Sequence, residues 1–138
     1  MEACITEWER MEEEIEPPSL PLWNFQMAKV RLFHMLIYDV DYTNARNLLV
    51  DKDFKIYIID SGRSFRLHHE LRKPEGLRLF SRQLLDRLRA LTPELLAEKL
   101  GPWLTEAQIE ALLHRRDLIV ARAEELVAEK GEGAVLYQ

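Results

Sequence analysis

Hydrophobic positions divide the chain into one long helix, two short strands and a helical C-terminal half. Between Trp23 and Tyr38, apolar residues recur every three to four positions without an intervening glycine or proline. This period predicts a helix, and further apolar positions beside the main stripe indicate that it is buried on most sides. The stripe consists of Trp23, Met27, Val30, Phe33 and Ile37.

A polar loop at residues 39–46 separates this helix from two short strand-like stretches. These are residues 47–50, Asn-Leu-Leu-Val, and residues 55–59, Lys-Ile-Tyr-Ile-Ile. The second is rich in β-branched and aromatic residues, which favour strands, and the polar residues 51–54 suit a hairpin turn. Residues 60–62, Asp-Ser-Gly, follow directly, and their glycine permits a sharp change of direction.

The C-terminal half carries the signals of three helices. Apolar residues between 77 and 91 recur at helical spacing and predict one amphipathic helix. Residues 92–94, Thr-Pro-Glu, provide a threonine cap and a proline at the first helical position, and Gly-Pro at 101–102 stops that second helix. Residues 105–108, Thr-Glu-Ala-Gln, form a capping box that opens a last helix through about Glu129.

The two ends of the chain differ from this central part. Residues 3–15 can form a short acidic helix, and prolines at positions 17, 18 and 21 predict an extended linker. We therefore divide the chain into an acidic, Pro-rich segment, residues 1–21, and a domain, residues 22–138. The tail from Gly131 is expected to be frayed unless residues 135–137 pack back. The predicted fold class is α+β, mostly α-helical with one small β-hairpin.

Composition and charge narrow the classes of function. The 138 residues are 47% hydrophobic, which suits one domain with a buried core. The net charge of −5 is concentrated in the first sixteen residues, which hold seven glutamates and one arginine. A nucleic-acid-binding protein is expected to be basic, so we expect no nucleic-acid partner. The single cysteine, Cys4, excludes an internal disulfide. We see no signal peptide and no membrane span, and expect a cytoplasmic protein.

Polar residues at the two ends of the predicted hairpin suit phosphoryl transfer. That reaction needs metal ions on the phosphates and a group that orients the attacking hydroxyl. Kinases supply these from an Asp-x-x-x-x-Asn loop and from an Asp-x-Gly that follows a strand. Here Asp41 lies in the polar loop, Asn47 opens the first strand and Asp60 follows the second. The hairpin is expected to bring Asn47 and Asp60 together, and both are oxygen donors suited to Mg²⁺.

Several stretches resemble a bacterial family of uncharacterised kinase-like proteins. They are residues 23–41, 47–51 (Asn-Leu-Leu-Val-Asp), 59–66 (Ile-Asp-Ser-Gly-Arg-Ser-Phe-Arg) and 112–120. These stretches are similar to the atypical kinases around the phosphatidylinositol kinases, the HipA toxin kinases and the Golgi casein kinase. The resemblance spans roughly residues 15–137 and implies the C-terminal lobe of a kinase-like fold.

The resemblance also implies roles for individual residues. Asp41 would be the catalytic-loop aspartate, Asn47 and Asp60 would hold the metal, and Arg63 would belong to the cofactor-binding set. Phe65 matches the phenylalanine that follows the metal aspartate in the family. The implied cofactors are Mg²⁺ and ATP, and the implied activity is that of an ATP-dependent phosphotransferase.

The loop spacing departs from the kinase pattern. Asn47 lies six positions after Asp41, where kinases have five. Asp39 and Asn44 have the spacing of five, but no strand follows Asn44 directly. We therefore favour Asn47 with a loop that is one residue longer.

The usual ATP-covering lobe is not recognisable in this sequence. No glycine precedes Gly62, and Lys29 is the only lysine before Lys52, whereas kinases cover the phosphates with a glycine-rich loop and a strand lysine. We therefore expect the chain to need a missing N-lobe or a protein partner. The alternative is a catalytically inactive, pseudokinase-type interaction module, and a third possibility is a purely structural helical domain.

Simpler interpretations exist for each polar residue of the site. Asp60 is also typical of a turn, Asp41 of an exposed loop, and Asn47 of an amide that caps a loop.

The histidines have simple interpretations too. His34 is expected to be a hydrogen-bonded residue in the core or at its edge rather than a ligand. His68 and His69 are expected to be solvated, because no second ligand pair at metal spacing accompanies them. His114 has no assigned role.

Overall fold

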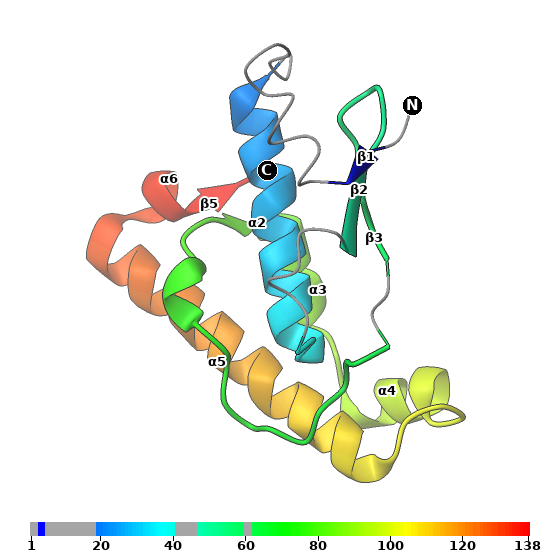
Figure 1. Cartoon of the computed structure of the whole chain (residues 1–138). Coiled ribbons are helices and arrows are strands. Elements are labelled where there is room, and N and C mark those ends of the chain that lie inside the picture. The colour runs from blue at the N-terminus through cyan, green and yellow to red at the C-terminus, as the bar shows by residue number, and fades with distance from the viewer. Residues whose placement is uncertain (1–2, 5–18, 41–46, 60–61) are drawn as a thin grey trace.

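A long helix, α2 (Leu20–Ile37), stands at the centre of the molecule in the computed structural model (Figure 1). The structure describes residues 3–4, 19–40, 47–59 and 62–138. The other elements are β1 (Ala3–Cys4), β2 (Leu48–Val50), β3 (Ile56–Ile58), the 3-10 helix η2 (Pro74–Gly76), β4 (Phe80–Ser81), α3 (Arg82–Arg89), α4 (Pro93–Leu100), α5 (Glu106–Lys130), α6 (Glu132–Val135) and β5 (Leu136–Tyr137). The predicted class, mostly helical α+β with a small hairpin, is confirmed.

Helix α2 begins earlier than the sequence predicted. The hydroxyl of Ser19 accepts a hydrogen bond from the Leu22 amide at 3.4 Å, which satisfies one of the free donors of the first turn. Pro21 lies in that turn, where its missing N–H is no loss. Its assignment to the linker was therefore wrong. The helix ends at Tyr38, which adopts the left-handed conformation with φ of 48°.

The small sheet has the strand order β1–β2–β3, and all its pairs are antiparallel. The predicted β2–β3 hairpin is confirmed. One carboxylate oxygen of Asp51 organises its turn by accepting hydrogen bonds from the amides of Asp53 and Lys55 at 2.9 and 3.0 Å. Residues 3–4, expected at the start of a helix, instead pair with β2, whose edge offers unpaired backbone groups. The rest of that predicted helix lies outside the described residues.

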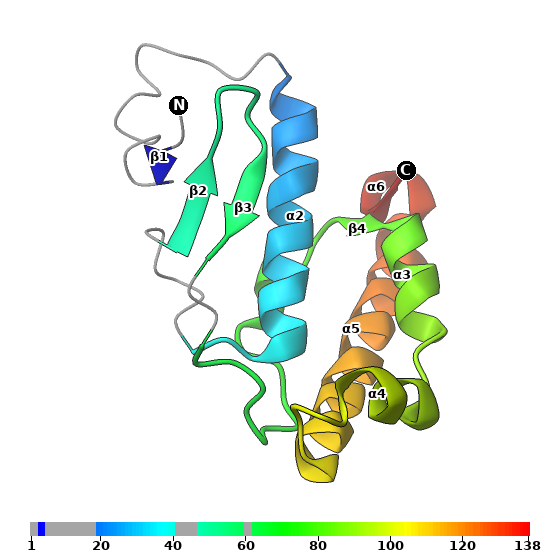
Figure 2. The same cartoon turned by 90° about the vertical axis from the view of Figure 1, so that its right-hand side faces the viewer.

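Helix α2 is packed on two sides. Figure 2 shows the sheet on one side of α2 and the helices α3, α4 and α5 on the other. Val30 packs on the buried residues of β2, whereas Leu32 and Met35 join the larger core built mainly from the C-terminal half. Phe33, which the predicted stripe included, is 41% exposed because it faces neither layer. Helix α2 therefore contributes side chains to two separate apolar cores.

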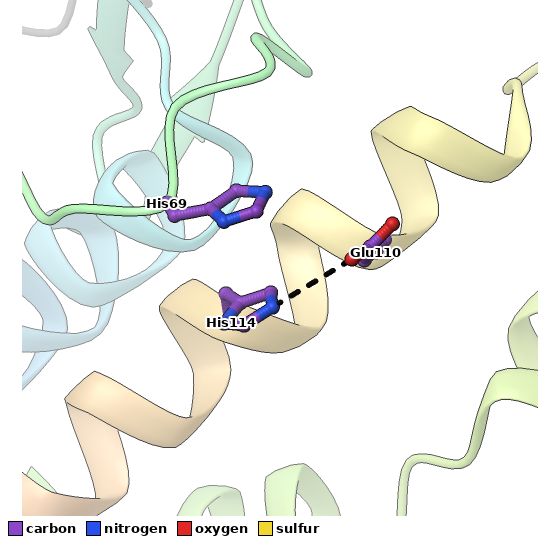
Figure 3. A group of neighbouring side chains, drawn as sticks. All are labelled: His69, Glu110 and His114. Carbon is purple, nitrogen blue, oxygen red and sulfur yellow. Dashed lines mark ion pairs between the residues drawn. The ribbon is translucent and has the colours of Figure 1, made fainter.

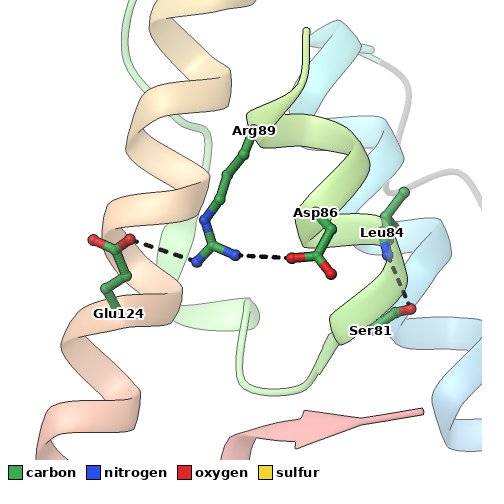
Figure 4. Close-up of polar contacts among 5 residues, drawn as sticks. All are labelled: Ser81, Leu84, Asp86, Arg89 and Glu124. Carbon is green, nitrogen blue, oxygen red and sulfur yellow. Dashed lines mark hydrogen bonds and ion pairs between the residues drawn. The ribbon is translucent and has the colours of Figure 1, made fainter.

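The first helix of the C-terminal half is shorter than predicted. We expected helix from about residue 77, but α3 begins only at Arg82 because Ser81 caps it, accepting a bond from the Leu84 amide at 3.2 Å (Figure 4). Phe80 and Ser81 are extended because they pair in parallel with β5. The same figure shows Arg89 of α3 bridging to Glu124 of α5 at 3.5 Å.

The caps of the last two long helices are confirmed. The hydroxyl of Thr92 accepts from the Leu95 amide at 3.1 Å, and proline follows it at the first helical position. Thr105 and Gln108 form the reciprocal capping box, with bonds of 2.8 and 3.2 Å. None of the helices in the described ranges is both long and apolar enough to cross a bilayer.

The tail packs against the body of the protein through residues 135–137, which is the alternative to fraying that the sequence left open. Val135 is buried, and the Tyr137 ring stacks on Phe25 of α2 with 4.2 Å between centroids. The Tyr137 hydroxyl donates to the Phe25 carbonyl at 2.8 Å. Burial raises the pKa of Tyr137 to about 12, so this donor stays protonated over the physiological range.

One charged residue, Arg115, is completely buried in the middle of α5. Its guanidinium donates to the carbonyls of Leu36 at 2.9 Å, Arg66 at 2.8 Å and His68 at 2.6 Å. It also lies 5.6 Å from the centroid of the Tyr38 ring, within cation–π range. Arg115 therefore ties α5 both to the end of α2 and to the segment that follows the hairpin.

Replacing Arg115 should be among the most damaging changes to stability. Arg115→Met keeps most of the apolar stem but removes every donor, which leaves the carbonyls of Leu36, Arg66 and His68 without this partner. We expect a loss of about 3–5 kcal/mol in the free energy of unfolding, measured by urea denaturation. Arg87→Met, on the exposed part of α3, is the matched control and should change it by less than about 0.5 kcal/mol. Equal effects of the two changes would contradict the proposed role.

The buried pair His34 and Asp39 predicts a pH dependence of stability. The two side chains are 3% and 1% exposed, and His34 Nε2 lies 3.9 Å from Asp39 Oδ2. The core position predicted for His34 is confirmed. Burial lowers the pKa of His34 from its usual 6.5, and the charge of Asp39 opposes this only in part.

Because the folded pKa is lowered, stability is full above about pH 6.5 and falls as the pH drops, since only unfolded His34 takes up the proton. The loss can reach about 1.4 kcal/mol per pH unit. Urea denaturation at pH 7.5 and 5.5 should show a smaller difference for His34→Gln than for the original chain. The same difference in both would rule out this source.

Candidate functional site

The structure describes two of the four residues that the sequence predicted for the site. Asn47 lies immediately before β2 and is 7% exposed, whereas Arg63 is exposed in the turn after the hairpin. Asp41 and Asp60 lie outside the described residues. The site is therefore defined by the residues that flank these two aspartates in the sequence.

Backbone hydrogen bonds connect those flanking residues in pairs. The Ile59 amide donates to the Asn47 carbonyl at 2.9 Å, which extends the hairpin ladder by one pair. The Val40 amide donates to the Arg63 carbonyl at 3.4 Å. The residue before Asp60 thus pairs with Asn47, and the residue before Asp41 pairs with Arg63.

These pairs bring the borders of the predicted catalytic loop and of the predicted metal-binding turn together. Residue 40 enters the loop and residue 47 leaves it, while residue 59 enters the turn and residue 63 follows it. Each of the two backbone bonds described above joins one border of the loop to one border of the turn. The sequence predicted that the hairpin brings Asn47 and Asp60 together, and the backbone bond places Ile59, the residue before Asp60, beside Asn47.

Two polar side chains, Gln26 and Arg72, attach the hairpin and the approach to the predicted loop to other segments. Gln26 of α2 donates to the Phe54 carbonyl at 2.7 Å and accepts from the Ile56 amide at 3.2 Å. Arg72 donates to the Val40 carbonyl at 2.9 Å. The hairpin and the approach to the loop are therefore each fixed by a polar side chain from another segment.

A cavity of about 460 Å³ lies beside the start of β2. Its wall includes Leu48, the residue after Asn47, and three cationic side chains, Arg31, Lys73 and Arg78, against the single carboxylate of Glu75. The volume is within the range of small-molecule sites. The surplus of positive charge favours an anionic ligand.

A second group of polar side chains, not predicted from the sequence, lies elsewhere on the surface. His69, expected to be solvated, is exposed but lies against His114, to which no role was assigned. Glu110 completes the group. The only signal in the sequence was the spacing of Glu110 and His114, which places them on one face of a helix.

Comparisons with known proteins do not assign the chain to a family. No protein-family model, no curated protein and no solved structure matches it.

The hairpin that carries Asn47 should depend on Gln26. Gln26→Ala removes both bonds to the hairpin, each worth about 1 kcal/mol. We expect hydrogen exchange in residues 54–58 to accelerate roughly 5- to 30-fold, measured by mass spectrometry, while exchange in α5 stays unchanged. Gln83→Ala, at an exposed position of α3, is the control. Unchanged exchange in the hairpin of Gln26→Ala would contradict this anchoring role.

Proposed function

We propose that this chain is a kinase-like phosphotransferase module that binds Mg-nucleotide through Asn47 and Asp60. The observation that carries the proposal is the hydrogen bond between Ile59 and Asn47. It supports a short distance between the side-chain amide of Asn47 and the side-chain carboxylate of Asp60, the residue that follows Ile59 in the sequence. An amide and a carboxylate oxygen are suitable donors for Mg²⁺.

The backbone hydrogen bond between Val40 and Arg63 supports a role for a third residue, Asp41, in the proposed site. Asp41 follows Val40 directly, so a catalytic loop that begins there starts beside the turn that follows Asp60. In this proposal Asp41 orients the acceptor hydroxyl and takes its proton. Catalysis would come from positioning and charge neutralisation rather than from a covalent intermediate.

The cationic cavity beside β2 supports an anionic ligand such as a nucleotide. Its three basic side chains would offset the negative charge of phosphate groups next to Leu48, the neighbour of Asn47. Bound Mg²⁺ would supply neutralisation of the charge that develops on the phosphoryl group. We further propose that the module acts in the cytoplasm, where ATP is the usual phosphate donor, together with an N-lobe or a protein partner.

The alternative function is a catalytically inactive, pseudokinase-type interaction module. The first glycine of the sequence, Gly62, comes after both the predicted catalytic loop and Asp60, so this sequence shows no glycine-rich loop before them. In this second interpretation the hairpin is a structural remnant.

A thermal-shift titration with ATP distinguishes the phosphotransferase module from the inactive interaction module. With ATP at ten times its dissociation constant, Mg²⁺-dependent binding should add about 1.4 kcal/mol of stability and raise Tm by about 4–7 °C. Asp60→Asn should abolish this shift, because it removes the charged metal ligand. Asp53→Asn is the matched control, because Asp53 is an exposed residue in the turn of the same hairpin and should retain the full shift.

The pattern of results decides the proposal. A Mg²⁺-dependent shift that Asp53→Asn keeps and Asp60→Asn loses supports the nucleotide site. Absence of any shift at millimolar ATP, or a shift that Asp60→Asn keeps, contradicts it and favours the interaction module.

A further inference from the structure

Three side chains of types that can bind a metal ion lie close together at the surface of α5, away from the hairpin. Glu110 and His114 lie one helical turn apart on α5, and His69 reaches them from the segment between β3 and η2 (Figure 3). One ligand atom from each lies within 4.8 Å of the other two. His114 Nε2 is 3.8 Å from Glu110 Oε1, and the two imidazole rings stack with 4.1 Å between centroids.

Hydrogen bonds from the buried Arg115 hold the segment that carries His69 against α5. Arg115, the residue after His114, is buried and donates to the carbonyls of Arg66 and His68. The backbone just before His69 is therefore attached to the same turn of α5 that carries His114. This attachment fixes the approach of two ligands that are 45 positions apart in the sequence. Helical spacing fixes the third, because residues four apart lie on one face.

We propose that His69, Glu110 and His114 form a site for a divalent transition metal, with Zn²⁺ as the expected ion. Two imidazole nitrogens and one carboxylate oxygen are a donor set that suits Zn²⁺. Mg²⁺ prefers oxygen ligands alone and is disfavoured by imidazole. Three protein ligands leave a fourth coordination position for water or another ligand.

Binding requires a small rearrangement of the side chains. Zn²⁺ binds its nitrogen and oxygen ligands at about 2.0–2.2 Å, so atoms up to 4.8 Å apart must move closer together. The rings are also nearly parallel, with 10° between their planes. Since an imidazole binds metal within its ring plane, one ring must turn. All three side chains are exposed, so no core packing opposes this motion.

The ion would form a link on the outside of the protein, opposite the buried contacts of Arg115. It would attach the segment around His69 to α5 without any contribution from Asn47 or Asp60. The neighbouring His68 is engaged elsewhere, because its ring stacks on Tyr38 at 4.5 Å and its Nδ1 lies 3.3 Å from Glu70. His68 is therefore an internal control for a histidine in the same segment.

The test is a Zn²⁺ titration of chelator-treated protein without an affinity tag, followed by calorimetry. Visible absorption with Co²⁺ as the probe reports nitrogen ligation independently. We expect one ion per chain. His69→Ala and His114→Ala should each weaken binding at least about tenfold, and Glu110→Gln should also weaken it. His68→Ala should stay within about twofold of the original chain.

Several results would overturn the site. They are no Zn²⁺ binding by the original chain, binding that His69→Ala and His114→Ala both retain, and displacement by a millimolar excess of Mg²⁺. Any of them would leave the group as a ring stack with an ordinary ion pair. Circular dichroism of each variant checks that the exposed substitutions leave the fold intact. Asp60→Asn should bind Zn²⁺ normally, so failure of the proposed nucleotide site does not affect this result.

Discussion

The structure depends on one buried cation, Arg115, that has backbone carbonyls as its partners. Its guanidinium collects the carbonyls of Leu36, Arg66 and His68 at a point where α2, α5 and the long connection after the hairpin meet. The cost of burying this charge is offset only while the bonds are made. Such a buried charge favours a single arrangement of α2, α5 and the connection after the hairpin. If one of these segments moved relative to the others, a hydrogen bond of Arg115 would break and leave a buried donor without its partner.

Helix α2 carries this constraint to the candidate site. Its last turn is held by Arg115, and its middle holds the hairpin through Gln26 and through Val30. The connection after the hairpin returns to α2, where the Phe65 amide donates to the Ile37 carbonyl. The borders of the predicted catalytic loop and metal-binding turn are thus positioned by a helix that is itself fixed on both sides.

Local signals in the sequence predicted the fold well, and non-local ones did not. Thr92 and Thr105 cap helices as expected, because a cap depends on residues within three positions. The start of α3 was missed because Phe80 pairs with a strand more than fifty positions later. Arg115 was missed because its partners are carbonyls, which no residue type reveals. The β2–β3 hairpin was predicted from the sequence, whereas the meeting of His69 with His114 needed the tertiary fold.

The contact between Tyr137 and Phe25 has a consequence for how the chain folds. The two residues are 112 positions apart, and β5 reaches β4 across more than fifty. Contacts of such long range form only after the entropy of closing a large loop has been overcome. The contacts among α3, α4 and α5 are shorter in sequence, so these helices can associate first. The C-terminal tail then packs on α2 last, and this packing step is expected to limit the folding rate.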